Sequence, residues 1–158
     1  MTDATVRLNL TWITELQSAL QSVGDRYQVM PELRCIFGDH LIVADVAVID
    51  RERVVLMDES EPIDQFWAAP DWIIQVLLPK QSLNRVMEPL LHSCQFGNRL
   101  AWVVDPYEEA ILSLFPDRQP LICRRADPLP CLPGLPLTLT AEQIFGWLKV
   151  GSQPEETA

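Results

Sequence analysis

Apolar residues recur at helical spacing in two long stretches of the chain. In residues 8–23 they lie three and four positions apart, which predicts an amphipathic helix that ends at Gly24. Residues 82–96 carry a second apolar stripe of the same period, but Pro89 lies inside it. Because proline lacks a backbone N–H and clashes with the preceding turn, we expect this helix either to be kinked at Pro89 or to begin late, with Pro89 in its first turn.

Runs rich in β-branched and aromatic residues predict a sheet. The pair Gly38-Asp39 separates two such runs and predicts a hairpin turn. Three of the runs are almost continuously apolar, which favours central strands covered by helices on both faces. The predicted strands are residues 27–30, 33–37, 41–49, 72–78, 100–104, 110–115 and 121–123.

The remaining stretches predict connections and one more helix. Residues 58–69 are acidic and turn-like, and the proline-rich residues 128–136 predict an extended loop. Thr140 and Gln143 have the spacing of a capping box, which predicts a helix that begins there. Residues 151–158 predict a flexible tail.

The order of these elements predicts one domain over residues 1–150, with a mixed central β-sheet flanked by helices, an α/β fold of the α+β type. Hydrophobic residues make up 48% of the 158 residues, which is enough to form a core. No long apolar run predicts a membrane span, and the N-terminus lacks the pattern of a signal peptide, so we expect a cytoplasmic protein. The four cysteines lack metal-ligand spacing and are expected to be reduced thiols.

The charge of the chain argues against general nucleic-acid binding. The formal net charge is −10, and the 12 lysines and arginines are scattered, with Arg124-Arg125 as the longest basic run. Sequence-independent DNA binding depends on basic residues that neutralise phosphates. The overall field therefore disfavours DNA as a partner, although a local basic patch remains open.

Two polar residues interrupt the apolar strands and are the first candidates for chemistry. Asp45 lies within residues 41–49, and Gln75 lies within residues 72–78. A buried carboxylate needs a metal, a cation or hydrogen-bond donors, so the two residues could together form a site at one end of the sheet. The alternative is structural: Asp45 accepts backbone N–H groups, and Gln75 satisfies the edge of a strand.

Four stretches of the sequence resemble one protein family. They are Val43-Ala-Asp-Val-Ala-Val-Ile49, Ala69-Pro-Asp-Trp-Ile-Ile-Gln-Val-Leu-Leu-Pro79, Phe96-Gly-Asn-Arg-Leu-Ala-Trp-Val-Val-Asp-Pro106 and Leu132-Pro-Gly-Leu-Pro-Leu137. In this order they are similar to the Uma-type family of restriction-endonuclease-like proteins, small bacterial members of the PD-(D/E)XK nuclease superfamily. The similarity spans about residues 8–150. It implies a restriction-endonuclease-like core and a cleft in which Mg²⁺ promotes phosphodiester cleavage.

The resemblance implies three site positions, of which this chain keeps one. In the family, an Asp and a Glu hold a divalent metal, and a Lys on the next helix orients or activates the attacking water. Asp45 matches the Asp, whereas Gln75 stands at the Glu position and keeps an oxygen without its charge. Pro89 stands at the Lys position and cannot orient water, and Ala44 and Leu78 replace a Pro and a Ser of the motif. A metal at Asp45 and Gln75 is therefore expected to bind weakly, if it binds at all.

Other residues near these positions are candidates to compensate. Lys80 and Arg85 could supply positive charge, although an arginine stays protonated and cannot act as a base. Glu88 and His92 could approach from the same helix, and the alternative for all four is a solvated surface position. Asp71 follows a proline and is interpreted as a turn carboxylate.

Large apolar side chains bear on possible partners. Trp12, Trp67 and Trp72 are candidates for exposed apolar surface, and we expect a homodimer that would bury such residues. A further group is expected to lie in the core or at an interface: Met87, Trp102, Phe115, Phe145 and Trp147.

The sequence favours a catalytically degenerate nuclease-like protein that acts through binding or oligomerisation. The alternative is an active metal-dependent DNA endonuclease that uses Asp45 with compensating residues. An unrelated small-molecule enzyme has no motif in its favour, because the chain lacks a phosphate-cradling glycine loop and a recognisable nucleophile constellation.

Overall fold

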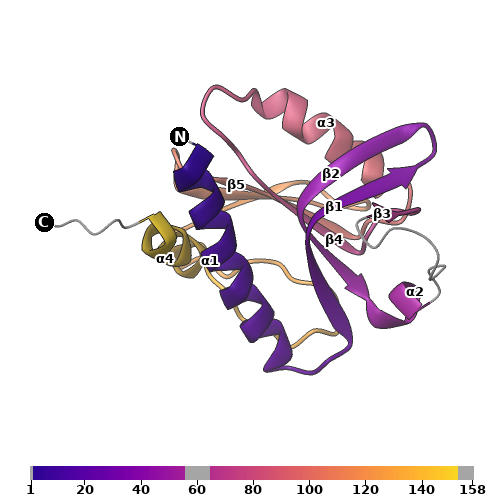
Figure 1. The fold of residues 1–158 in the computed structure, drawn as a ribbon, viewed down its shortest axis with the longest axis horizontal. Helices are drawn as coiled ribbons and strands as arrows, with labels where there is room; N and C mark the ends of the chain where they lie inside the picture. Colours follow the sequence, from indigo (N-terminus) through magenta and orange to yellow (C-terminus); the bar gives the residue numbers. More distant parts are fainter. Residues whose placement is uncertain (1, 56–64, 153–158) are drawn as a thin grey trace, which may run out of the picture.

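A mixed β-sheet with helices on both faces forms the protein, seen in a computed structural model that describes residues 2–55 and 65–152 (Figure 1). The helices are α1 (Thr2–Gln21), α2 (Arg51–Val55), α3 (Leu83–Cys94) and α4 (Ala141–Ser152). The strands are β1 (Tyr27–Phe37), β2 (His40–Asp50), β3 (Gln65–Phe66), β4 (Trp72–Val76), β5 (Leu100–Asp105), β6 (Ala110–Leu114) and β7 (Leu121–Arg124).

The sheet order is β3-β1-β2-β4-β5-β6-β7. Strands β1 and β2 form the antiparallel hairpin predicted around Gly38, and β2 pairs with β4 antiparallel. Strands β4 and β5 run parallel, connected through α3, and β5, β6 and β7 continue the sheet antiparallel. The mixed sheet flanked by helices confirms the predicted fold class.

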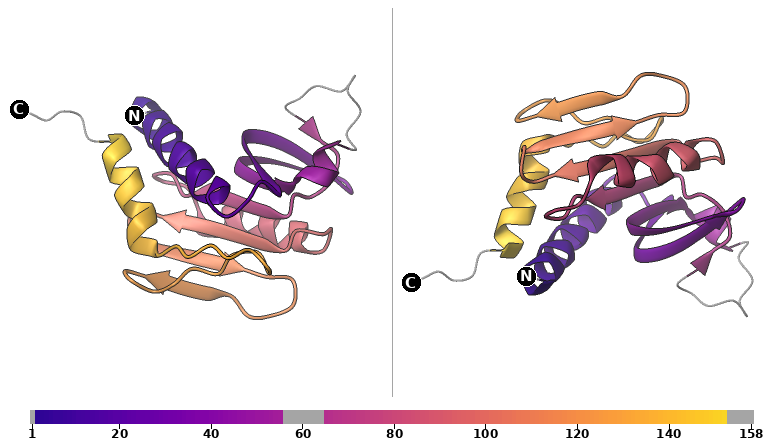
Figure 2. Two further views of the ribbon diagram at one scale, coloured as in Figure 1. Left: turned by 90° about the horizontal axis from the view of Figure 1, so that it is seen from below. Right: turned by 90° about the horizontal axis from the view of Figure 1, so that it is seen from above.

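Helices cover the two faces of the sheet with separate cores. Helices α1 and α4 lie side by side on one face, where Trp12 and Phe145 pack with Trp72 and Trp102 of the central strands (Figures 1 and 2). Helix α3 covers the opposite face, where its residue Leu90 belongs to the second core cluster (Figure 2). The almost continuous apolar runs of β4 and β5 follow from this double coverage.

Tryptophan burial corrects part of the sequence interpretation. Trp12 and Trp72 were candidates for exposed surface, but both are fully buried, and the Trp72 ring meets Trp102 edge-on with ring centroids 4.7 Å apart. The surface interpretation was wrong for these two because each lies on the core-facing side of its element. Trp67 is 59% exposed, as expected. The indole of Trp102 donates to the carbonyl of Pro130.

Several element boundaries also differ from the prediction. The predicted strands at residues 27–30 and 33–37 form one strand, β1, that continues through Pro31 and Glu32. The short α2 and β3 were not predicted. The helix predicted at residues 8–23 begins at Thr2 and ends at Gln21.

Helix α3 begins at Leu83, with Pro89 in its interior. The late start that would put Pro89 in the first turn is therefore wrong. Helix α4 begins as predicted, because Thr140 Oγ1 accepts from the Gln143 N–H while the Gln143 side chain accepts from the Thr140 N–H.

Two predicted segments, the acidic stretch and the C-terminal tail, lie partly outside the described residues. Of the acidic stretch at residues 58–69, only the part from residue 65 is described. Helix α4 extends to Ser152, so the described chain continues as helix past residue 150, and the rest of the predicted tail lies outside the described residues. Within the part of the chain that the structure describes, no helix has the length and apolar character needed to cross a membrane.

One irregularity in the β1–β2 hairpin shapes the candidate site. The regular pairs include Pro31 with Val46 and Leu33 with Ala44, but the intervening Glu32 and Asp45 are not paired, and Glu32 has φ 49°. On one side of this point Val46 packs beneath α1 and α4, and on the other side Ala44 packs beneath α3. The hairpin therefore rotates at Asp45 and turns away from β4.

Candidate functional site

The candidate site lies where β2 separates from β4. The last regular pair of these antiparallel strands is Val46 with Ile74. The next pair would be Asp45 with Gln75, but these two residues form no backbone pair. Their side chains form hydrogen bonds to the backbone of the facing strand instead. The two residues that the sequence singled out are therefore brought together.

The Gln75 side chain bridges the gap like a missing peptide unit. Its Oε1 accepts the Asp45 N–H at 2.6 Å, and its Nε2 donates to the Val43 carbonyl at 3.2 Å. Because one partner is a donor and the other an acceptor, the orientation of the carboxamide follows from its surroundings. A glutamate could accept the first bond, but when ionised it could not donate the second.

Asp45 reaches across the gap in the other direction. Its Oδ2 accepts the Val76 N–H at 2.7 Å, so each strand satisfies the other's backbone with a side chain. Burial raises the pKa of the Asp45 carboxyl above its ordinary value. The Val76 N–H opposes this shift, and the nearby Glu32 charge adds to it.

A cleft of about 290 Å³ opens beside these two residues. Helix α3 forms its other wall with Arg85, Val86 and Pro89. Pro89 therefore stands against the cleft, at the position where the resemblance implied a lysine. The lining is Val43, Asp45, Gln75, Val76, Leu78, Gln81, Arg85, Val86 and Pro89.

Of the candidates for compensation, Arg85 alone is a lining residue of this cleft. Lys80 is exposed in the turn after β4, with φ 64°, and is not a lining residue. Glu88 is exposed on α3. His92 packs against His40 of β2, with ring centroids 4.0 Å apart, and so connects α3 to the hairpin outside the cleft lining.

These residues do not fit a hard divalent cation. Mg²⁺ is held by carboxylates and other oxygens in near-octahedral geometry. Among the described lining residues Asp45 is the one carboxylate, and one of its oxygens already accepts a backbone N–H. Gln75 Oε1 is likewise engaged, and the Arg85 cation shares the cleft.

Asp71 belongs to a different cluster at the opposite end of β4. Its carboxylate forms an ion pair with Arg53 at 3.0 Å, lies 3.9 Å from Arg99, and accepts the Asp50 N–H. The Asp71 backbone carbonyl also accepts the N–H groups of Arg99 and Leu100. Asp71 lies in a bend before β4, where its side chain contacts the end of β2, helix α2 and the residue before β5.

The sequence matches the family described as "Uma2: Putative restriction endonuclease" over residues 1–142, most of the chain. The chain belongs to the Uma2 family. Among solved structures, this Uma2 chain is similar to a putative nuclease belonging to DUF820 from Anabaena variabilis, with a TM-score of 0.76 and 31% sequence identity. The match covers 89% of this chain and 82% of the other. A comparison with curated proteins finds no match.

Membership of the Uma2 family confirms the resemblance derived from the sequence motifs, and the structural neighbour supports a nuclease-like fold. Restriction-endonuclease-like families are generally metal-dependent. The sequence left open whether Gln75 binds a metal or has a structural role. The structural alternative, in which Asp45 accepts a backbone N–H and Gln75 satisfies a strand edge, describes the hydrogen bonds of this Uma2 chain.

Proposed function

We propose that this chain is a degenerate restriction-endonuclease-like protein that acts through binding or oligomerisation. The observation that carries the proposal is the double hydrogen bond of the Gln75 side chain to the Asp45 N–H and the Val43 carbonyl. A side chain that replaces backbone pairing in this way has a structural task. Moving its oxygen to a metal would leave two backbone groups of β2 without these partners.

The charges of the cleft support the same conclusion. Gln75 is neutral where the resemblance implies a glutamate, so the cleft has one negative charge fewer than that pattern. Arg85 adds a positive charge to the cleft lining. Both changes weaken the attraction for a divalent cation. Pro89 occupies the helix position that faces the cleft and offers no side-chain donor or base.

An active endonuclease is the second candidate, because Arg85 lines the same cleft as Asp45. In that case Asp45 would hold Mg²⁺, which would supply Lewis-acid chemistry, and the Arg85 guanidinium would stabilise the charge of the phosphodiester in place of the lysine that the resemblance implies. This candidate requires the Gln75 oxygen to serve both the Asp45 N–H and the metal.

Calorimetric titration of Mg²⁺ and Mn²⁺ tests the proposal. The matched control is Asp45→Asn, which keeps an oxygen acceptor for the Val76 N–H but removes the charge. We expect the native chain and the variant to give the same heats of dilution. Saturable metal binding by the native chain that the Asp45→Asn variant lacks would overturn the proposal and favour the second candidate.

The proposed oligomer is a homodimer in the cytoplasm. Apolar side chains on β2 and beside it are exposed, including Leu41 at 54%, Val43 at 48% and Leu78 at 39%, and Val43 and Leu78 both line the cleft. Exposed apolar residues of this kind favour a contact surface. Sedimentation equilibrium tests the dimer, which Val43→Glu should weaken. A native chain that stays monomeric at every concentration refutes it.

A further inference from the structure

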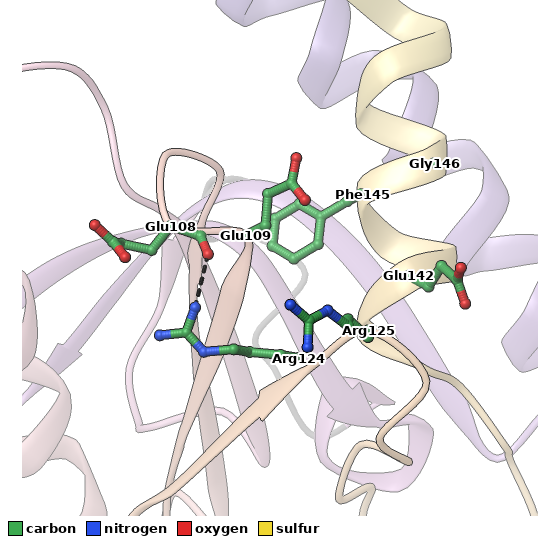
Figure 3. Close-up of a pocket in the computed structure, with 7 residues that line it drawn as sticks. All are labelled: Glu108, Glu109, Arg124, Arg125, Glu142, Phe145 and Gly146. Atoms are coloured by element: carbon green, nitrogen blue, oxygen red, sulfur yellow. Dashed lines mark hydrogen bonds between the residues drawn. The ribbon is translucent and has the colours of Figure 1, made fainter.

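A second cavity, of about 380 Å³, lies between the β5–β6 turn, the end of β7 and α4 (Figure 3). Its lining consists of Glu108, Glu109, Arg124, Arg125, Glu142, Phe145 and Gly146. It lies at the same end of the strands as the Asp45–Gln75 cleft, because Val76 pairs with Val104, Asp105 with Ala110, and Ala110 with Arg124. Strands β5 and β6 stand between the two sites.

The two guanidinium groups of this cavity are its most distinctive feature. Arg124 donates one N–H to the Glu108 carbonyl at 2.9 Å, which leaves its other N–H groups for a further acceptor. Among the described residues, no ion pair or hydrogen bond engages the Arg125 guanidinium. Arg124-Arg125 is also the longest basic run of a chain whose net charge is −10.

The backbone holds both arginines in place. Asp127 Oδ2 accepts the Arg124 N–H, and the Asp127 N–H donates to the Arg124 carbonyl. Arg125 has φ 55°, a left-handed conformation that costs free energy for a residue with a side chain. Its carbonyl accepts the Glu142 N–H at 2.8 Å, so the first turn of α4 fixes this conformation.

Among the described residues, the three glutamates at the cavity form no ion pair with Arg124 or Arg125. In Figure 3 the carboxylates of Glu108 and Glu142 point away on opposite sides, and the Arg125 guanidinium lies in the space between. Glu109 is oriented away from Arg124 and extends past the Phe145 ring in this view. The two guanidinium groups therefore remain open to a bound anion, and Phe145 provides an apolar wall.

We propose that this cavity binds a phosphate group, with Arg125 as its main ligand, Arg124 as a second, and Phe145 beside the group to which the phosphate is attached. Arginine forks match the oxygens of phosphate, and charge-assisted hydrogen bonds are the strong ones. The volume is at the lower end for small-molecule sites and suits a phosphate monoester of nucleotide size. The proposal goes beyond the proposed function and does not depend on whether Asp45 holds a metal.

Gly146 offers a way to block the cavity without changing its charges. A Cβ added there meets no other atom within 4 Å, so a side chain can begin at this position without a clash, and we expect a leucine to occupy part of the cavity. Leucine is also a better helix former than glycine, and α4 should become more stable. Arg34, exposed on β1, provides the matched control for the loss of one positive charge.

NMR of the arginine side-chain Nε–Hε groups tests the proposal, with inorganic phosphate as the probe and chloride at equal ionic strength as the reference. We expect saturable shifts at Arg124 and Arg125, a loss of affinity of about tenfold or more in Arg125→Gln, and a similar loss in Gly146→Leu. Arg34→Gln should bind phosphate like the native chain. Thermal unfolding checks that every variant is folded.

Two further probes distinguish the source of the phosphate. Tighter binding of adenosine 5′-monophosphate than of inorganic phosphate supports a free nucleotide, and still tighter binding of a 5′-phosphorylated single-stranded oligonucleotide supports a nucleic-acid end. Shifts that do not saturate, that chloride reproduces, or that survive Arg125→Gln overturn the proposal.

Discussion

The Gln75→Glu substitution restores the acidic residue that the Uma2 resemblance implies, and we predict that it destabilises the fold. The change is isosteric but replaces the Nε2 donor, which bonds to the Val43 carbonyl at 3.2 Å, with an oxygen. Loss of this bond costs about 1 kcal/mol. The new charge also faces the Val43 carbonyl and lies near the Asp45 carboxylate, which adds about 1 kcal/mol more. We expect the free energy of unfolding to fall by about 2 kcal/mol at neutral pH.

The predicted loss depends on pH in a defined direction. The introduced glutamate would have a pKa above its value in the unfolded chain, because the ionised form is repelled and the protonated form can donate to the Val43 carbonyl. The destabilisation should therefore be nearly absent below about pH 4 and grow as the pH rises through the folded-state pKa. Urea unfolding at about pH 5.5 and pH 8 measures it, with Gln119→Glu in the exposed β6–β7 connection as the matched control. A variant as stable as the native chain at both pH values would refute the bridging role of Gln75.

Three further substitutions test other parts of the account by urea unfolding. Asp45→Asn should raise the free energy of unfolding at neutral pH, because burial raises the pKa of Asp45, and the gain should vanish as the pH falls below the ordinary pKa of aspartate. Asp71→Asn should cost about 2 kcal/mol, because it leaves Arg53 and Arg99 without their carboxylate, discounted for the partial exposure of both arginines. Thr140→Ala should cost about 1 kcal/mol through loss of the helix cap, and an unchanged midpoint would contradict the capping geometry.

Much of the fold could be predicted because the pattern within each element is strong. The central strands β4 and β5 are almost continuously apolar, and the capping box before α4 depends on residues only three positions apart. The short elements α2 and β3 were missed because five and two residues are too few to show a period. The burial of Trp12 and Trp72 depends on which face of each element meets the core, which the sequence did not reveal.

The candidate site, too, could be predicted only in part. Asp45 and Gln75 could be found as polar residues in apolar strands, and their convergence follows from the antiparallel pairing of β2 with β4. The role of Gln75 could not be chosen, because it depends on where the β1–β2 hairpin turns away from β4, and this point is set by Glu32 and Asp45 together. The Arg125 cavity likewise depends on three segments that are distant in sequence.

Plasmid nicking in the presence of Mg²⁺ or Mn²⁺ tests the central claim most directly. The account predicts that the native chain cleaves no faster than the Asp45→Asn variant, because the Gln75 side chain bonds to the backbone of β2 and Pro89 stands where the resemblance implies a lysine. Metal-dependent cleavage by the native chain that disappears in the Asp45→Asn variant would contradict it.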